Sequence, residues 1–287
     1  ALSYIWPRTE GGSGTQSGSL CLEQSTLSDL TEPGFLHRKD GNNFIPSVVY
    51  HAMNVTRKLG EVYLWVGRFC IKQDDEMKEM QISHMGDIYG GAYLTIVGAA
   101  TEALFSEKMA ADDCFMFDTD NSMYRDGRGD WIILNLKELA TRLYSSLGRS
   151  TWTKRGWTYQ EQIMSKRLVI FMERGIFWDC ECGIWDGWNM KIGDEEANVL
   201  LIIDEDGTVS TESGLSYQKH CGGQWWPDFS LYMDLVCPYS GRNLTYPQDG
   251  LRAISSMLKN LASVFPGGLV AGLPMIFLDH VLLWQPS

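Results

Sequence analysis

The chain has 287 residues, carries a formal net charge of −12 and is 44% hydrophobic. This apolar content suffices for one large core, or for a core with a smaller packed extension. A chain this acidic repels phosphate backbones and anionic lipid headgroups, so we expect no nucleic-acid partner and no anionic membrane surface as a partner. No stretch approaches the ~18 consecutive apolar residues that cross a bilayer, so we also expect no membrane span.

The seven cysteines are odd in number and irregularly spaced, at positions 21, 70, 114, 180, 182, 221 and 237. In a chain of this length, that pattern fits free thiols in a reducing compartment better than a disulfide framework. It therefore predicts a cytoplasmic protein without structural disulfides. Cys180 and Cys182 resemble half of a metal site, but no second pair stands at metal-ligand spacing, so we predict no bound metal.

Three apolar runs in the first hundred residues are typical of buried strands, at residues 2–6, 62–66 and 94–97. Helical patterns separate them at residues 46–59, which Gly60 ends, and at residues 74–90, which Asp74 begins. Buried strands that alternate with helices imply right-handed crossovers and a parallel sheet. The sequence thus predicts the α/β class, with a central mostly parallel sheet flanked by helices. The predicted central positions are Leu64, Val66, Ile96 and Val97, and we expect all four to be buried.

The second half of the chain divides by composition. Two apolar segments at residues 168–171 and 176–179 flank a Glu-Arg-Gly turn and predict a β-hairpin. Residues 186–228 are acidic and rich in glycine, which favours a variable insertion. Helical patterns return after it and predict a C-terminal extension. We therefore divide the chain into a core at residues 1–185, the insertion at 186–228 and a helical extension at 229–287 that packs on the core.

Three sequence blocks resemble the fungal heterokaryon-incompatibility (HET) domain. The first is Ala1-Leu-Ser-Tyr-Ile-Trp6, and the second is Tyr63-Leu-Trp-Val-Gly-Arg-Phe-Cys-Ile-Lys-Gln-Asp-Asp75. The third is Arg155-Gly-Trp-Thr-Tyr-Gln-Glu161. Taken together, in this order and spacing, the blocks are highly specific, although each alone would be a weak signal. One departure is Gly67, which stands where the family usually has an aspartate.

The resemblance implies an intracellular signalling or effector module that triggers regulated cell death after non-self recognition, an immunity-like role. Its activity would be controlled by protein partners or by self-association. The family is thought to be remotely similar in fold to Toll/interleukin-1 receptor (TIR) domains, which have a flavodoxin-like sheet. Because some TIR domains cleave NAD, a second hypothesis is an NAD-cleaving enzyme, with NAD as the substrate. The absence of aspartate at Gly67 adds a third, a non-catalytic interaction module.

In an open parallel sheet, ligands bind beyond the carboxyl ends of the strands. Trp6, Cys70 and Gly98 lie at predicted strand ends, and Asp74 and Trp157 lie in adjoining segments. These five residues are our candidate ligand-binding residues, because aromatic walls, a small-residue floor and a carboxylate suit a flat ring and a ribose. For Cys70, a buried inert thiol is the alternative. For Asp74, the alternative is a helix start.

Glu161 is the candidate catalytic residue. A carboxylate can bind ribose hydroxyls and stabilise an oxocarbenium-like centre during N-glycosidic cleavage, by analogy with glycoside hydrolysis. The structural alternative is a capping box, in which Thr158 begins a helix and Glu161 returns to the Thr158 backbone N–H. We expect Trp6, Cys70, Gly98 and Glu161 to approach one another at one edge of the sheet, because each lies at a strand end or at an adjoining helix start.

Overall fold

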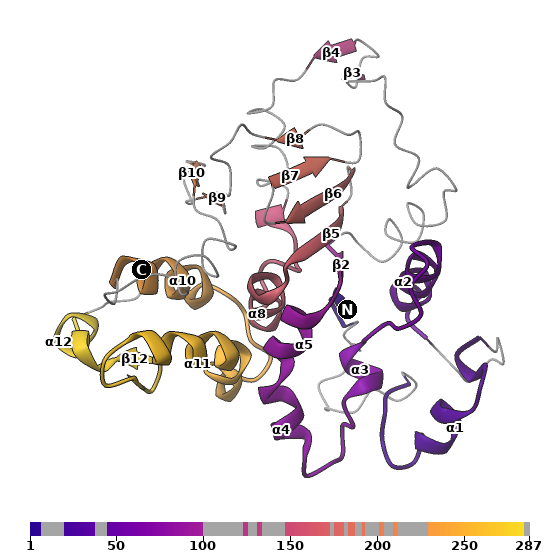
Figure 1. Ribbon diagram of the computed structural model, residues 1–287, viewed down its shortest axis with the longest axis horizontal. Helices are drawn as coiled ribbons and strands as arrows, with labels where there is room; N and C mark the ends of the chain where they lie inside the picture. The colour runs from indigo at the N-terminus through magenta and orange to yellow at the C-terminus, as the bar shows by residue number, and fades with distance from the viewer. Residues whose placement is uncertain are drawn as a thin grey trace.

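A computed structural model describes residues 1–6, 20–37, 45–99, 147–172, 175–180 and 229–283, together with the backbones of six short strands in between. Its centre is a six-stranded sheet in the order β1-β2-β5-β6-β7-β8 (Figure 1). The strands are β1 (Leu2–Tyr4), β2 (Thr95–Gly98), β5 (Arg167–Met172), β6 (Gly175–Cys180), β7 (Gly183–Asp186) and β8 (Lys191–Ile192). β1, β2 and β5 are parallel, and β6 to β8 continue the sheet in antiparallel fashion.

Helices flank the parallel strands of this sheet, and further helices lie beyond them (Figure 1). They are α1 (Leu27–Thr31), α2 (Ser47–Lys58), α3 (Gly67–Cys70), α4 (Lys78–Ser83), α5 (Met85–Gly91), α8 (Gly156–Met164), α10 (Phe229–Ser240), α11 (Ser255–Val264) and α12 (Leu278–Val281). Short two-stranded pairs complete the described elements: β3 (Met123–Arg125) with β4 (Trp131–Ile133), β9 (Leu201–Ile203) with β10 (Val209–Thr211), and β11 (Leu269–Val270) with β12 (Leu273–Pro274). The α/β class and the hairpin formed by β5 and β6 are confirmed. Apart from Asp186 at the end of β7 and the strands β8, β9 and β10, the predicted insertion at 186–228 lies outside the described residues.

The parallel strands are covered on both faces, which explains their continuous apolar character. Successive side chains of a strand point to opposite faces. Leu2 and Tyr4 pack with the buried side chains of α2, whereas Ser3 points to α8. A second polar contact on the α8 face joins Thr95 of β2 to Ser165, 2.7 Å apart between hydroxyl oxygens. Figure 1 shows α2 on one side of β1 and β2, and α5 with α8 on the other.

The predicted strand at residues 62–66 is wrong in extent. Its only strand-like pairing is a single bridge between Leu2 and Val66, with the Leu2 amide donating to the Trp65 carbonyl over 2.9 Å. Val62 and Tyr63 are 80% and 92% exposed, so the apolar run extends past the edge of the sheet into solvent. Of the four central positions, Val66, Ile96 and Val97 are buried as predicted, and Leu64 is half-buried.

The predicted helix at residues 74–90 is also corrected. It consists of two short helices, α4 and α5, which meet at His84. Asp74 does not cap either helix, because its carboxylate accepts the backbone N–H of Gln24 at 2.9 and 3.1 Å. The break allows Met85 and Tyr89 of α5 to face the core, while Met77 and Met80 remain about half exposed.

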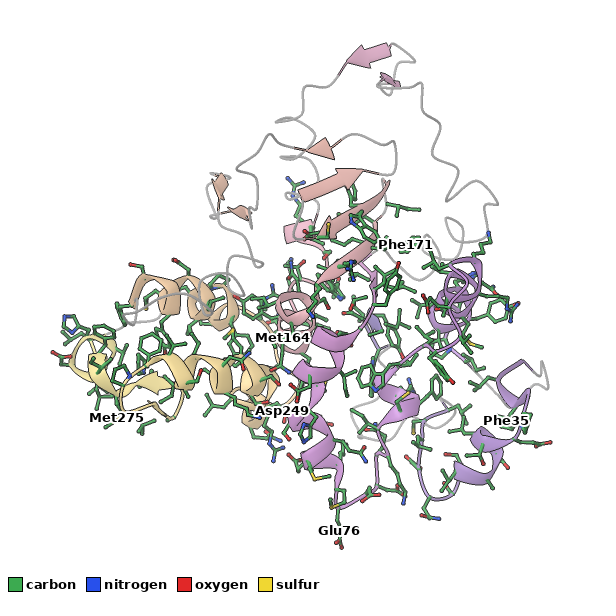
Figure 2. All side chains as sticks on the ribbon, in the orientation of Figure 1. Phe35, Glu76, Met164, Phe171, Asp249 and Met275 are labelled. Carbon is green, nitrogen blue, oxygen red and sulfur yellow. The ribbon has the colours of Figure 1, made fainter. Side chains whose placement is uncertain are left out.

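Residues 229–283, here called the C-terminal unit, pack against α5 and α8 rather than forming a separate body. One continuous core cluster contains Tyr89, Tyr159, Ile163 and Met164 from these two helices. It also contains the buried side chains of the C-terminal unit: Tyr232, Leu235, Val236, Ile254, Met257, Leu261, Phe265 and Val281. Figure 1 shows the orange and yellow elements beyond α8, on the side away from α2, and Figure 2 labels Met164 where α8 meets α5.

The junction of α5 with α11 depends on a glycine. A Cβ atom on Gly86 would lie 2.2 Å from Ser256 Cβ, which is closer than atoms can approach without a backbone shift. The Gly86 N–H donates to Ser256 Oγ at 3.2 Å across the same contact. The small residue in α5 therefore lets the C-terminal unit approach closely enough to bury both groups.

Gly86→Ala should destabilise the protein by about 1–3 kcal/mol, the usual cost of overpacking a core. Gly91→Ala is the matched control in the same helix, because a Cβ there meets no atom within 4 Å. It should be neutral, or stabilising by up to about 1 kcal/mol. Urea unfolding of the two variants measures both effects. Equal stability of the two variants would contradict the close approach of α5 to α11.

Candidate functional site

Helix α8 carries the third sequence block, and its start differs from the predicted capping box. Its N-cap residue is Arg155, with extended backbone angles, so Thr158 lies inside the first turn. The Thr158 hydroxyl donates to the carbonyls of Trp152 and Arg155, at 2.5 and 2.8 Å. Glu161 is consequently not the partner of an N-cap residue. The predicted capping box of Thr158 and Glu161 is therefore wrong.

Glu161 instead belongs to a buried hydrogen-bond network that joins α8 to β1. The Ser3 hydroxyl donates to Glu161 Oε2 and accepts the indole N–H of Trp152 at 2.7 Å. The Tyr89 hydroxyl, from α5, donates to the Leu2 carbonyl at 3.1 Å and also lies within hydrogen-bonding reach of the Glu161 carboxyl. Trp152 is fully buried, and Glu161 is 9% exposed. Ser3, Tyr89, Trp152 and Glu161 are called the Glu161 network below.

Burial dominates the electrostatics of this network. Removal from water disfavours the charged carboxylate and raises the pKa of Glu161 to about 7. The hydrogen bond from Ser3, the positive charge of Arg155 and the nearby Tyr89 hydroxyl oppose this shift, but they do not cancel it. A carboxyl group with a pKa near neutrality, next to an arginine, is a known signature of functional sites, and structural networks produce it as well.

A second polar cluster lies on the α2 face of β1. The Arg68 guanidinium carbon is 5.5 Å from the ring centroid of Trp6, and Arg68 Nε donates to the Leu20 carbonyl at 2.7 Å. Arg68 also interacts with the Tyr4 hydroxyl, although burial still raises the pKa of Tyr4 to about 12. Gly98 is level with Tyr4 in the sheet register. Trp6, Arg68, Tyr4 and Gly98 thus gather near the carboxyl ends of β1 and β2.

The predicted candidate residues therefore do not form one pocket. They lie in separate parts of the structure. Tyr4 packs with α2, and the neighbouring Ser3 binds Glu161 on the opposite face, so strand β1 separates Trp6 and Gly98 from Glu161. The Cys70 thiol accepts the Val66 N–H at 3.4 Å and interacts with the amino group of Ala1, at the other end of β1. The Cys70 side chain is exposed, so the alternative of a buried thiol is wrong. Partial removal of its sulfur from water nevertheless raises the pKa of Cys70, which lowers the fraction present as reactive thiolate.

The two remaining candidates have local structural partners. Asp74 fixes the segment that begins at residue 20, through its contact with Gln24. Trp157 packs against the core cluster shared by α8 and the C-terminal unit. Neither residue joins the Glu161 network through a contact among the described residues.

Comparisons with known proteins decide the family. The family model described as heterokaryon incompatibility protein (HET) matches residues 1–161, more than half of the chain. The chain belongs to the HET family. The matched region of this HET protein begins with the β1 block and ends at Glu161, so the Glu161 network lies wholly inside it. Searches of curated proteins and of solved structures found no match.

Two structural expectations for this HET protein concern metals and membranes. Among the described residues, no group of three or more His, Cys, Asp or Glu side chains is placed to hold a metal ion. No helix in the described part of the chain combines the length and apolar character needed to traverse a bilayer. Cys21, Cys70, Cys180 and Cys237 are free thiols, and the other three cysteines lie outside the described ranges.

Sequence reasoning missed Ser3, Trp152 and Tyr89 as partners of Glu161. Ser3 carried a signal, since it is a polar residue within an otherwise apolar buried strand, and such a residue requires a hydrogen-bond partner. Trp152 gave no comparable signal, because a tryptophan in an irregular segment fits many environments. Arg68 lay inside the second sequence block, but its burial at 4% exposure is a tertiary effect.

Ser3→Ala should destabilise the protein by about 1–3 kcal/mol, because it leaves the buried Trp152 N–H without its acceptor and Glu161 without its donor. Ser263→Ala is the matched control, since that hydroxyl is exposed and bonds only to the Asn260 carbonyl of its own helix. The control should change stability by less than about 0.5 kcal/mol. Urea denaturation measures both variants, and a Ser3→Ala protein as stable as the control would exclude the network as a stabilising element.

Proposed function

We propose that this HET-family protein is a signalling or effector module for heterokaryon incompatibility, the fungal response in which non-self recognition leads to regulated cell death. It would act in the cytoplasm, through protein partners or self-association. The family match supports the incompatibility-type assignment. The geometry of Glu161 supports a module that acts by binding rather than by chemistry.

The observation that carries this proposal is the hydrogen bond from Ser3 to Glu161. It directs the most strongly polar group of α8 inward, to the adjacent strand β1. Tyr159 and Gln160, the two preceding residues, also bond to other parts of the protein. A catalytic carboxylate must reach the reacting atoms of a substrate within about 3 Å, directly or through one water. Glu161 is 9% exposed and its carboxyl is bonded to the sheet, so its position suits a structural tie between elements.

Cleavage of NAD is a second candidate function, and the raised pKa of Glu161 favours it. A buried carboxyl poised near neutrality beside Arg155 could stabilise a developing cation once a conformational change admitted the substrate. Trp6, with Arg68 beneath its ring, would then offer an aromatic surface near the carboxyl ends of the parallel strands. The family's usual aspartate is replaced by Gly67 at the start of α3, which favours the non-catalytic reading.

The substitution Glu161→Gln separates these functions. Glutamine has the shape of a protonated glutamate and can still accept the Ser3 hydroxyl, so the loss of stability should be at most about 1 kcal/mol. If Glu161 is structural, the variant should kill cells in a fungal expression host as the natural sequence does, with no NAD-dependent nicotinamide release from either protein. Melting temperature, nicotinamide release and toxicity should be measured on the same preparations and strains.

Two results would change the assignment. A folded Glu161→Gln protein that loses both nicotinamide release and toxicity would establish the enzymatic function and overturn the binding module. The unmutated protein is also expressed in hosts with and without the matching incompatibility partner. If it is folded but harmless in both hosts, the cell-death assignment itself is contradicted.

A further inference from the structure

Residues 20–31, here called the strap, run along the surface of the protein without a core of their own. No side chain in this range is buried, and none belongs to either of the two core clusters. The first buried side chain after the strap is Phe35, at 8% exposed. In Figure 1, helix α1 of the strap lies at the edge of the molecule, beyond α3. Because apolar burial is the main favourable term in folding, the strap gains little stability from packing.

Backbone hydrogen bonds join the strap to the segment at residues 68–74. The Leu22 N–H donates to the Arg68 carbonyl at 3.0 Å. The Gln73 N–H donates to the Leu22 carbonyl at 2.8 Å. Both polar groups of one strap residue thus bind the same segment, so Leu22 is a point where the strap is fixed to the rest of the protein.

Two side chains of the same segment bind Gln24. The Asp74 carboxylate accepts the Gln24 backbone N–H, and the Lys72 ammonium donates to the Gln24 side-chain carbonyl at 2.7 Å. These contacts are exposed to water, which competes for the same groups and leaves a small net free energy per bond. A segment with few buried apolar contacts and with exposed hydrogen bonds opens at a lower free energy than the core.

The strap covers a cationic side chain. Arg68 is 4% exposed, and its Nε–H donates to the Leu20 carbonyl at 2.7 Å. The Arg68 guanidinium carbon also lies 5.5 Å from the ring centroid of Trp6, which follows the carboxyl end of β1 and is 37% exposed. When the strap leaves, it takes the Leu20 carbonyl with it and opens the guanidinium on that side.

We propose that the strap opens as one unit, independently of the core, and that its opening uncovers the Arg68 guanidinium beside Trp6. A guanidinium next to an aromatic ring is suited to bind carboxylate and phosphate groups. Ligands of open α/β sheets bind at the carboxyl ends of the parallel strands. The strap therefore controls access to this end of the sheet, whether the HET protein acts by binding partners or by cleaving NAD.

Hydrogen exchange of single backbone amides, followed by NMR, tests the opening. The amides of Leu22 and Gln73, called the joining amides, should have equal protection factors, because one opening breaks both bonds. The Ile96 amide donates to the Ala1 carbonyl at 2.8 Å, between β2 and β1, and serves as the core reference. It should be protected at least about 100-fold more strongly. Joining amides as protected as the core reference would overturn the proposal.

Asp74→Ala should loosen the strap. It should raise the exchange rates of both joining amides by a common factor of about 3–10, the effect of one lost hydrogen bond, without changing the core reference. Lys72→Ala is a second variant that should act in the same direction. Asp87→Ala is the matched control, because that exposed carboxylate contacts His84 and not the strap, and it should change none of these rates. Unequal factors for the two joining amides, or no change in either variant, would contradict a single opening unit.

The Nε–H of Arg68 shows whether the strap covers this side chain. Its NMR signal is assigned through the carbons of its own side chain, and its exchange rate is measured in the same samples. Asp74→Ala should raise this rate by the same factor as it raises the rates of the joining amides. An Arg68 Nε–H rate that Asp74→Ala leaves unchanged would show that the strap opens without uncovering Arg68, and would overturn the proposal.

Discussion

Three consecutive side chains of α8 hold the molecule together in three directions. The Tyr159 hydroxyl donates to the Leu235 carbonyl of α10 at 2.7 Å, and Gln160 Oε1 accepts the Ser256 N–H at the start of α11, at 2.9 Å. Glu161 accepts the Ser3 hydroxyl of β1. Successive residues of an α-helix are turned by about 100°, so three in a row can bond to elements on different sides. The position of the sheet relative to the C-terminal unit depends on these contacts.

This arrangement ties the family-matched region to the part of the chain beyond it. The HET match ends at Glu161, but the core around α8 is completed by Tyr232, Met257 and Leu261 of the C-terminal unit. Arg242 adds to the contact, with its guanidinium carbon 4.4 Å from the ring centroid of Tyr159. A partner that bound the C-terminal unit would therefore act on the helix that carries Glu161, through side chains adjacent to it in sequence.

Helices and strands were predicted correctly where the local sequence pattern and the tertiary contacts of the segment favour the same structure. Helix α2 lies at its predicted place, because Pro46 and Gly60 bound an amphipathic segment whose buried side is Val48, Ala52 and Val55. Residues 62–66 have an equally apolar pattern, but only Val66 pairs with β1. The apolar character of a segment does not show whether the neighbouring strand is long enough to pair with all of it. Strand β1 has only three residues, which limits the pairing available to residues 62–66.

The candidate site was predicted less well, for a similar reason. Thr158 and Glu161 have the spacing of a capping box, and this motif is defined by local sequence alone. The helix begins at Gly156 instead, with Arg155 as its N-cap residue, and the backbone carbonyl of Asn243 in the distant C-terminal unit accepts the Gly156 N–H at 2.9 Å. Moving the start of the helix by three residues places Glu161 opposite Ser3. Residue types and spacing thus identified Glu161 as important, but its role depended on contacts more than eighty residues away in sequence.

A double-mutant cycle between Ser3 and Glu161 tests most directly whether this contact holds α8 to the sheet. Unfolding free energies are measured for Ser3→Ala, Glu161→Ala and the double variant, with Ser263→Ala and Glu161→Ala as a reference pair. Side chains that share a buried hydrogen bond couple by about 0.5–3 kcal/mol, and this is the result expected for Ser3 with Glu161. The reference pair should be additive. Additivity within about 0.3 kcal/mol for Ser3 and Glu161 as well would contradict the account.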